Sequence, residues 1–428
     1  MAERGGTVKA NHGYVRRLDP TPAQTEALDD QAHAARALWN LLHDWTTGHG
    51  RCHRPSLKDA DEAIRLARKE IPWLAAVPTQ AAQAILKTYR RAWTNFFEGR
   101  AMPPEFKGRL RSRAAIDIPQ ARDLAVKRLN RRWAQMWVPK VGVVRFRWTG
   151  PIPGVGREPG KVTGARLVRE ADGWHVAFRT EAVIADPTPR TGPMVGIDRG
   201  VNVALALSDG NDQTHGSWMK PKEQERLLRL ERTAARKRRH QKRGATVSNR
   251  LSRTYDQIAK LRARAKRRRT DWQHQTTTAL ANQYGVITAE DLKIANMVRK
   301  PKPKPDPDKA SNFLPNRRKA KAGLNRAMLG EAHATTVTML AYKLTERGGT
   351  LIKVPAAGTS QTCSQPGCGH RDPLSRKGIK FLCTKCGWVG HADTNAAVNI
   401  HAAGQVVYGL LSPASKGVEA SRSTRRAA

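Results

Sequence analysis

The chain has 428 residues, 39% of them hydrophobic, which is enough for two or three domains that each have their own core. Its 77 lysines and arginines outnumber 36 aspartates and glutamates, and the net charge of +41 indicates a nucleic acid partner, with a ribosomal-type or merely basic protein as the alternative. No apolar run approaches the ~18 residues of a membrane span and the start lacks a signal peptide's apolar core, so a cytosolic location is expected.

The first helix signal lies where Thr21 can act as a cap, Pro22 suits the first helical position and Gln24 can close a capping box. Helices are expected from there to about residue 100. One of them carries an apolar stripe that we interpret as core packing, formed by Ile85, Tyr89, Trp93 and Phe96.

Short runs rich in valine and tryptophan follow, separated by glycine and proline, and they predict β-strands. The best hairpin signal joins residues 167–170 to residues 174–178, with Asp172 and Gly173 supplying the turn. We therefore expect a small β-barrel into whose chain the early helices are inserted.

A second region begins at Met194, where VGIDRGVNVALALSDG predicts two tightly joined strands. Residues 220–270 hold 20 lysines and arginines against four acids on a helical pattern, which predicts paired long helices. Such a run can be a solvated face, but its size favours a surface that follows phosphates. The residues expected to bind nucleic acid are Arg236, Lys237, Arg238, Arg239, Lys242, Arg243, Arg262, Arg267, Arg268 and Arg269.

The C-terminal third is expected to alternate between strands and helices. VITAEDL predicts a buried strand that ends in acids, and KPKPKPDPDK predicts an extended linker. A helix over residues 325–347 and a strand over 349–354 should follow. The last helix is expected to begin at Asp393 and to stop at Gly404, before a disordered basic tail.

Two Mg²⁺ ions held by carboxylates can catalyse phosphodiester hydrolysis, and three positions along the chain could supply such carboxylates. Asp198 interrupts an apolar strand, although it could equally be a turn residue. Glu290 and Asp291 end another strand on opposite faces, and the pattern alone does not choose between them. Asp393 precedes a helix, where an ordinary N-cap is a strong alternative.

Four cysteines have the spacing of a tetrahedral zinc site. Cys363 and Cys368 are separated by four residues, and Cys383 and Cys386 by two, while Cys52 stands alone. Four sulfurs fill the coordination shell of zinc, so this Zn²⁺ is expected to be structural. His370 and His391 are available as substitutes but are not needed.

These segments together resemble the TnpB/OrfB proteins of insertion sequences and the compact type V CRISPR effectors. The resemblance covers nearly the whole chain, and its most specific parts are GIDRGV, AEDLKIANM, TSQTCS, CTKCG and HADTNAAVNI. It implies that Asp198, Glu290 and Asp393 are the catalytic, Mg²⁺-binding acids of a RuvC-type nuclease, which selects Glu290 over Asp291. Relatives usually space the first cysteine pair as C-x2-C, whereas this chain has the longer CSQPGC.

The resemblance also implies an α/β multidomain fold, with an RNase H-like RuvC domain interrupted by a zinc ribbon and preceded by a wedge β-barrel. The expected parts are wedge 1–20 and 113–190, helical recognition domain 21–112, nuclease 191–358 and 391–411, zinc ribbon 359–390, and tail 412–428. A prokaryotic, cytoplasmic protein that associates with the nucleoid through DNA is expected.

The function implied is that of an RNA-guided DNA endonuclease, in which a guide RNA pairs with target DNA beside a short flanking motif. Asn395 and Asn399 are interpreted as helix-positioning residues. Two alternatives remain, a guided DNA-binding repressor that does not cut and an accessory transposase. The presence of all three acids argues against the first, and the lack of an evident tyrosine-histidine nucleophile arrangement argues against the second.

Overall fold

The computed structural model describes residues 7–48, 56–109, 112–190, 192–241, 244–307 and 309–411. Two compact units make up the chain, Met1–Asp186 with Arg232–Ala263, and Pro187–Glu231 with Arg264–Ala428. Within the described ranges, no helix is both long and apolar enough to cross a membrane. The predicted tail, Lys242, Arg243 and Cys52 lie outside the described residues.

The first unit contains a seven-stranded antiparallel sheet with the order β2-β6-β7-β1-β5-β4-β3. Its strands are β1 (Thr7–Asp19), β2 (Ala115–Ile118), β3 (Lys127–Arg128), β4 (Trp133–Val138), β5 (Gly142–Arg147), β6 (Lys161–Glu170) and β7 (Gly173–Ala185). Because β1 pairs with both β5 and β7, the helices that follow it are inserted into the chain of the sheet, as predicted. Trp174, Phe146 and Phe178 fill the core of this unit.

The inserted helices are α1 (Pro22–Gly48), α2 (Leu57–Glu70) and α3 (Thr79–Phe97), with short 3₁₀ turns at Pro72–Ala76 and, later in the unit, at Ala121–Asp123. The capping box is confirmed, because the Gln24 N–H donates to Thr21 Oγ1 (3.2 Å) and the Thr21 N–H donates to Gln24 Oε1 (3.0 Å). The α3 stripe is also confirmed as packing, since Tyr89 is buried edge-on against Trp39 with ring centroids 5.0 Å apart.

The predicted hairpin is β6–β7, but its turn lies one residue earlier than expected. Glu170 pairs with Gly173, so Ala171 and Asp172 form the two-residue turn. Gly173 opens β7 with φ at 123°, a left-handed value that favours glycine.

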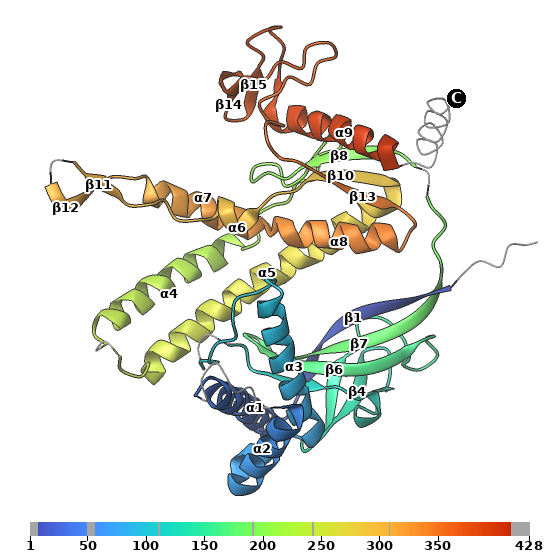
Figure 1. The fold of residues 1–428 in the computed structure, drawn as a ribbon, viewed down its shortest axis with the longest axis vertical. Helices are drawn as coiled ribbons and strands as arrows, with labels where there is room; N and C mark the ends of the chain where they lie inside the picture. Colours follow the sequence, from blue (N-terminus) through green and yellow to red (C-terminus); the bar gives the residue numbers. More distant parts are fainter. Residues whose placement is uncertain are drawn as a thin grey trace, which may run out of the picture. The chain divides into compact units, whose positions relative to one another are not determined.

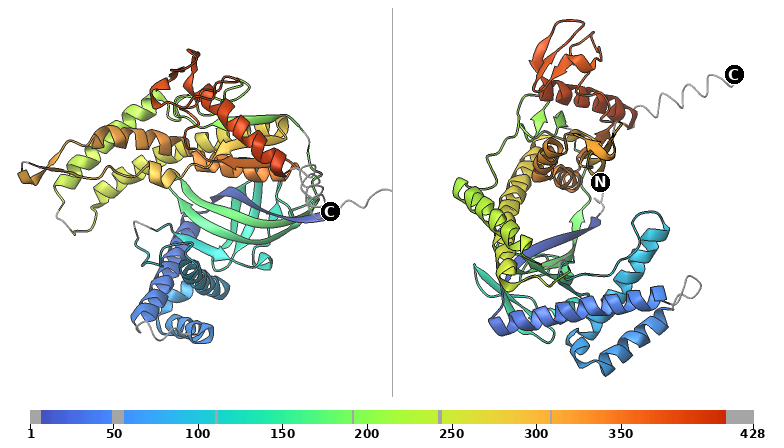
Figure 2. Two further views of the ribbon diagram at one scale, coloured as in Figure 1. Left: turned by 45° about the horizontal axis from the view of Figure 1, so that its top comes forward. Right: turned by 90° about the vertical axis from the view of Figure 1, so that its left-hand side faces the viewer.

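The second unit contains a four-stranded sheet with the order β13-β10-β8-β9. The strands β8 (Met194–Asp198), β10 (Val286–Glu290) and β13 (Thr350–Val354) are parallel, and the short β9 (Ala206–Leu207) is antiparallel. One face packs on α9 (Ala392–Leu411) through Ile352 and Ile400, and the other on α5 (Asn249–Gln283) and α8 (His333–Thr345) through Ile287 and Leu340. Figures 1 and 2 show α9 and α8 on opposite faces of these strands.

Burial on both faces explains the continuous apolar character of the parallel strands. The carboxyl ends of β8 and β10 lie side by side at one edge of the sheet, and parallel strands present residues for function at that edge. Asp198 and Glu290 are the last residues of these two strands.

The predicted helix over 325–347 is wrong as a single element. It consists of α7 (Arg318–Glu331) and α8, separated by Ala332 with φ at 51°. Side chains of α5 satisfy the carbonyls at the break, since Arg269 donates to Gly330 O (2.7 Å) and Gln273 donates to Glu331 O (3.1 Å). Caps supplied from a distant helix leave no signal in the local sequence.

Two further predictions need correction. The last helix does not stop at Gly404 but continues to Leu411. A Cβ at position 404 would lie 2.0 Å from Thr288 Oγ1, so the glycine there permits the close approach of α9 to β10. The predicted linker is instead a hairpin of β11 (Lys304–Asp306) and β12 (Lys309–Leu314), preceded by the short helix α6 (Ile294–Met297). Pro305 is the one proline within its two strands, and in an isolated two-stranded ribbon few ladder hydrogen bonds are lost at such a position.

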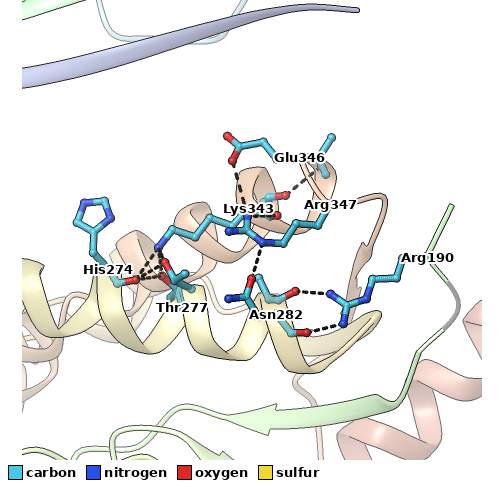
Figure 3. A network of polar contacts seen from close by, with 11 residues as sticks. Arg190, His274, Thr277, Asn282, Lys343, Glu346 and Arg347 are labelled. Atoms are coloured by element: carbon cyan, nitrogen blue, oxygen red, sulfur yellow. Dashed lines mark hydrogen bonds and ion pairs between the residues drawn. The ribbon is translucent and has the colours of Figure 1, made fainter. Parts of the chain in front are cut away.

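The long basic segment forms α4 (Pro221–Arg239) and α5, as predicted. A polar network joins α5 to α8 (Figure 3). The buried Lys343 ammonium donates to His274 O, Thr277 Oγ1 and Thr278 Oγ1, each at 2.7 Å, and burial lowers the Lys343 pKa to about 8. Arg190 donates to Ala281 O (3.1 Å) near the C-terminus of α5.

Candidate active site and cysteine cluster

The three predicted acids line one cavity of about 540 Å³ in the second unit. Asp198 ends β8, Glu290 ends β10 and Asp393 lies in the first turn of α9. The structure therefore brings together residues that are far apart in the sequence. Asp291 also lines the cavity, but its side chain is exposed, whereas Glu290 is only 8% exposed.

Burial and mutual repulsion dominate the electrostatics of this cavity. Burial, followed by the charges of Glu290 and Asp393, raises the pKa of Asp198 to about 7, although the Arg199 N–H donates to Asp198 Oδ1 (2.8 Å). Burial also raises the pKa of Glu290, against the effect of the Thr359 hydroxyl that donates to Glu290 Oε1. Clustered buried carboxylates are costly without cations beside them.

Two arginines supply part of the compensating charge. Arg376 Nη2 lies 2.9 Å from Asp393 Oδ1, and Arg199 Nη2 donates to the Glu290 backbone carbonyl. Neither arginine was predicted as a site residue. Arg376 lies among other cations of the cysteine segment, so nothing in the sequence distinguishes it. Arg199 did have a sequence signal, because it directly follows the candidate acid Asp198.

Among the described residues, the four cysteines form the one compact group of candidate metal ligands, with sulfur atoms that all lie within 4.8 Å of one another.

The raised pKa of Asp198 predicts that the metal-free protein is less stable at high pH. The folded state keeps this proton up to about pH 7, while the unfolded chain releases it near pH 4, so stability is lost as pH rises between these values. Asp198→Asn should remove this loss and stabilise the EDTA-treated protein at pH 8 by about 2 kcal/mol, discounted for solvent screening.

Thermal unfolding in EDTA at pH 5 and pH 8 measures this effect. The variant should unfold a few degrees above the wild type at pH 8, with a smaller gap at pH 5. Equal gaps at both pH values would contradict the assignment of a buried, repelled carboxylate.

The four cysteines form a compact cluster beside a small three-stranded sheet. Its strands are β14 (Arg376–Lys377), β15 (Lys380–Leu382) and β16 (Val389–His391), and a 3₁₀ turn at Pro373–Ser375 precedes β14. The Sγ atoms of Cys363 and Cys386 are 3.7 Å apart, as are those of Cys368 and Cys383. A tetrahedron with Zn–S bonds of about 2.3 Å has edges of about 3.8 Å, so the cluster fits zinc. The Cys386 N–H donates to Cys383 Sγ (3.4 Å) and lowers the pKa of that thiol to about 6.

Two asparagines of α9 connect this cluster to the acids. The buried Asn395 accepts from the Ser364 N–H (2.9 Å) and donates to Thr362 O (2.7 Å). Asn399 donates to Thr359 O (2.8 Å), and Thr359 in turn contacts Glu290. Both side chains therefore fix the loop between the cavity and the first cysteine pair, in line with the predicted positioning role.

The predicted basic residues fall into three groups. Exposed side chains belong to Arg236, Arg238, Arg239, Arg262 and Arg267. Three others serve contacts within the protein: Lys237 donates to Thr254 Oγ1 (2.9 Å), Arg268 forms two bonds to the Glu223 carboxylate, and Arg269 caps α7. Lys242 and Arg243 lie outside the described residues.

Sequence models of two families match this chain. The OrfB_IS605 model, described as "Probable transposase", matches residues 175–300, and the model of the Cas12f1-like TNB domain matches residues 333–400. Together these matches contain Asp198, Glu290, Asp393 and the four cysteines. The fold, the carboxylate cavity and these matches place the chain in the class of DNA nucleases.

A relative in Escherichia coli (strain K12), InsQ, named as a candidate RNA-guided DNA endonuclease, is 33% identical over 79% of this chain and 77% of its own length. A similarly named protein of Streptomyces pristinaespiralis is 27% identical over 92% of this chain and 90% of its own length. The chain therefore belongs to the TnpB/OrfB family, to which the compact type V effectors are related.

Structural similarity supports the fold. A solved Cas12f1–sgRNA–target DNA complex contains a chain that matches with a TM-score of 0.51 and 15% identity, over 89% of this chain and 82% of that one. At this identity the likeness establishes a shared fold.

Proposed function

We propose that the chain is an RNA-guided DNA endonuclease that pairs a guide RNA with target DNA beside a short flanking motif and hydrolyses the DNA at Asp198, Glu290 and Asp393. The convergence of these three acids in one cavity carries the proposal. The names of the relatives support the guided mode of action. In such a division of labour, base pairing reads the sequence and the protein reads shape and the flanking motif.

The oxygen ligands of the cavity suit Mg²⁺. Asp198, Glu290 and Asp393 would together hold the two ions. A bound Mg²⁺ pair supplies an activated water and a charge that stabilises the leaving 3′-oxygen. The chain itself excludes bulk water from Glu290 and Asp393, orients Glu290 through the Thr359 hydroxyl, and pairs Asp393 with Arg376.

For the cysteine cluster, the bound metal would be one Zn²⁺ ion. Four thiolates leave no open coordination position for water or substrate, so this ion would be structural. Its role would be to hold the segment that carries Arg376 next to the start of α9.

The domain layout follows the same proposal. The seven-stranded sheet would be the wedge and α1–α3 the recognition domain, within the boundaries given above. The four-stranded sheet with its flanking helices would be the RuvC-type nuclease and residues 359–390 the zinc ribbon. The exposed arginines of α4 and α5, together with Lys242 and Arg243, would contact phosphates of the guide RNA or the heteroduplex.

A plasmid-cleavage assay tests this proposal against its rivals. Cleavage should require both the co-purified RNA and Mg²⁺. Binding to the guided site without any cleavage would favour a repressor, and joined DNA products formed without RNA would favour a transposase.

Arg376→Ala is expected to lower the cleavage rate at saturating Mg²⁺ by about 10-fold, because a charge-assisted bond to Asp393 is lost. The Mg²⁺ concentration for half-maximal rate should not rise, since Arg376 competes with the ions for Asp393. Single-turnover rates across a Mg²⁺ titration measure both quantities, with Lys377→Ala on the same strand as the control. A raised Mg²⁺ requirement with an unchanged maximal rate would contradict this role.

A further inference from the structure

A groove lined by several cations lies between residues 298–301 and α7 in the second unit. It encloses about 590 Å³, and four cations line it: Lys300, Arg318, Lys321 and Arg326. No acidic residue is among its lining residues, and Val298 and Leu329 contribute apolar surface. We refer to it as the α7 groove.

The α7 groove adjoins the carboxylate cavity through one continuous segment of chain. Lys293, Asn296 and Met297 line the cavity, while Val298 and Lys300 line the groove. The junction is fixed to α7, because Lys321 Nζ donates to Met297 O (2.8 Å) and Asn325 Nδ2 donates to Val298 O (2.7 Å). A ligand that reaches the acids therefore has the α7 groove beside it.

The remaining cations of the groove are available for a ligand. Within the described part of the chain, Lys300, Arg318 and Arg326 have no ion pair or side-chain hydrogen bond, and all three side chains are exposed. Glu223, by contrast, engages Arg264 and Arg268 on α5, so cations of the same unit are paired where an acid is near.

We propose that the α7 groove binds the single DNA strand that passes through the carboxylate cavity, holding phosphates on one side of the scissile bond. A single strand offers both a row of phosphates and unstacked base faces, which matches a lining that combines four cations with apolar side chains. A duplex hides its base faces and would contact the cations alone. The inference rests on the proposed function and adds a subsite to it.

Neighbouring residues provide a matched pair of double variants. Lys300→Ala with Arg318→Ala removes two charges that line the groove. Arg299→Ala with Lys319→Ala removes two exposed charges from adjacent positions that do not line it. In single-turnover cleavage of a target duplex, the first pair should slow the reaction about 10-fold and the second less than about 2-fold.

Neutral methylphosphonates placed one at a time around the scissile bond locate the contact. At one or two positions on one side, neutralisation should slow the wild type about 10-fold but slow the Lys300/Arg318 pair less than about 2-fold further. The control pair should keep the full loss. Equal losses in all three proteins at every position would overturn the proposal.

A binding measurement on Asp198→Ala protein with its RNA needs no cleavage. For a 12-nucleotide oligothymidylate, the dependence of log affinity on log salt should become shallower by about 1.4 in the Lys300/Arg318 pair, two cations at about 0.7 each. An equal change in the control pair would overturn the proposal. If the wild type showed no RNA-guided cleavage, the proposed function would be refuted. The binding measurement would still test whether the α7 groove binds single-stranded DNA.

Discussion

Asp198→Ala is expected to abolish cleavage of target DNA, lowering the single-turnover rate by at least about 10³-fold, because each metal-bound carboxylate supports several kcal/mol of transition-state stabilisation. Glu290→Gln should have the same effect, since it removes the charge of a carboxylate that is buried in the cavity. Binding of the guide RNA should be unchanged, because neither side chain belongs to the basic helices.

Asp291→Asn is the matched control, because Asp291 neighbours Glu290 in the sequence and lines the same cavity, yet it is exposed. This variant should cleave within about 2-fold of the wild type. If Asp291→Asn were inactive and Glu290→Gln active, the assignment of the second acid would be wrong. Electrophoresis of a labelled target, with RNA binding measured on the same preparations, separates loss of chemistry from loss of assembly.

Cys383→Ser is expected to release zinc and to unfold the segment between residues 359 and 391. Zinc stabilises small structural sites by about 10–16 kcal/mol, and the core here is limited to a few residues around Phe381. Cleavage should fall by at least about 100-fold, because Arg376 and the Thr359 loop lose their support beside Asp393 and Glu290.

Metal analysis and limited proteolysis measure this outcome, with the lone Cys52→Ser as the control. The wild type and the control should contain one zinc per chain and resist cleavage in the cysteine segment. Full zinc content in Cys383→Ser, or full nuclease activity without zinc, would contradict the structural role.

Local sequence predicted the framework of the site well. The runs before Asp198 and Glu290 are short and apolar because both faces of a parallel sheet are covered, so the acid at each end stood out. The spacing of the two cysteine pairs likewise predicted that the four thiols would lie close enough to bind one metal ion. Pattern alone could not show that these acids meet, because strand pairing is a non-local property. Nor could it show that Glu290 is buried while Asp291 is exposed.

Tertiary contacts explain what the sequence did not predict. Arg376 is one of several cations in its segment, and only folding brings it to Asp393. The break at Ala332 depends on caps from α5, and Gly404 serves a close approach to Thr288 rather than a helix end. Arg268 and Arg269 matched the pattern of a nucleic-acid surface, yet they bind Glu223 and the end of α7.

The location of bound divalent ions tests the central claim most directly. Crystals of the protein soaked with Mn²⁺, which scatters anomalously and replaces Mg²⁺, should show two peaks about 4 Å apart, in contact with Asp198, Glu290 and Asp393. Mn²⁺ peaks found elsewhere on the chain, with none among these three carboxylates, would contradict the proposed nuclease centre.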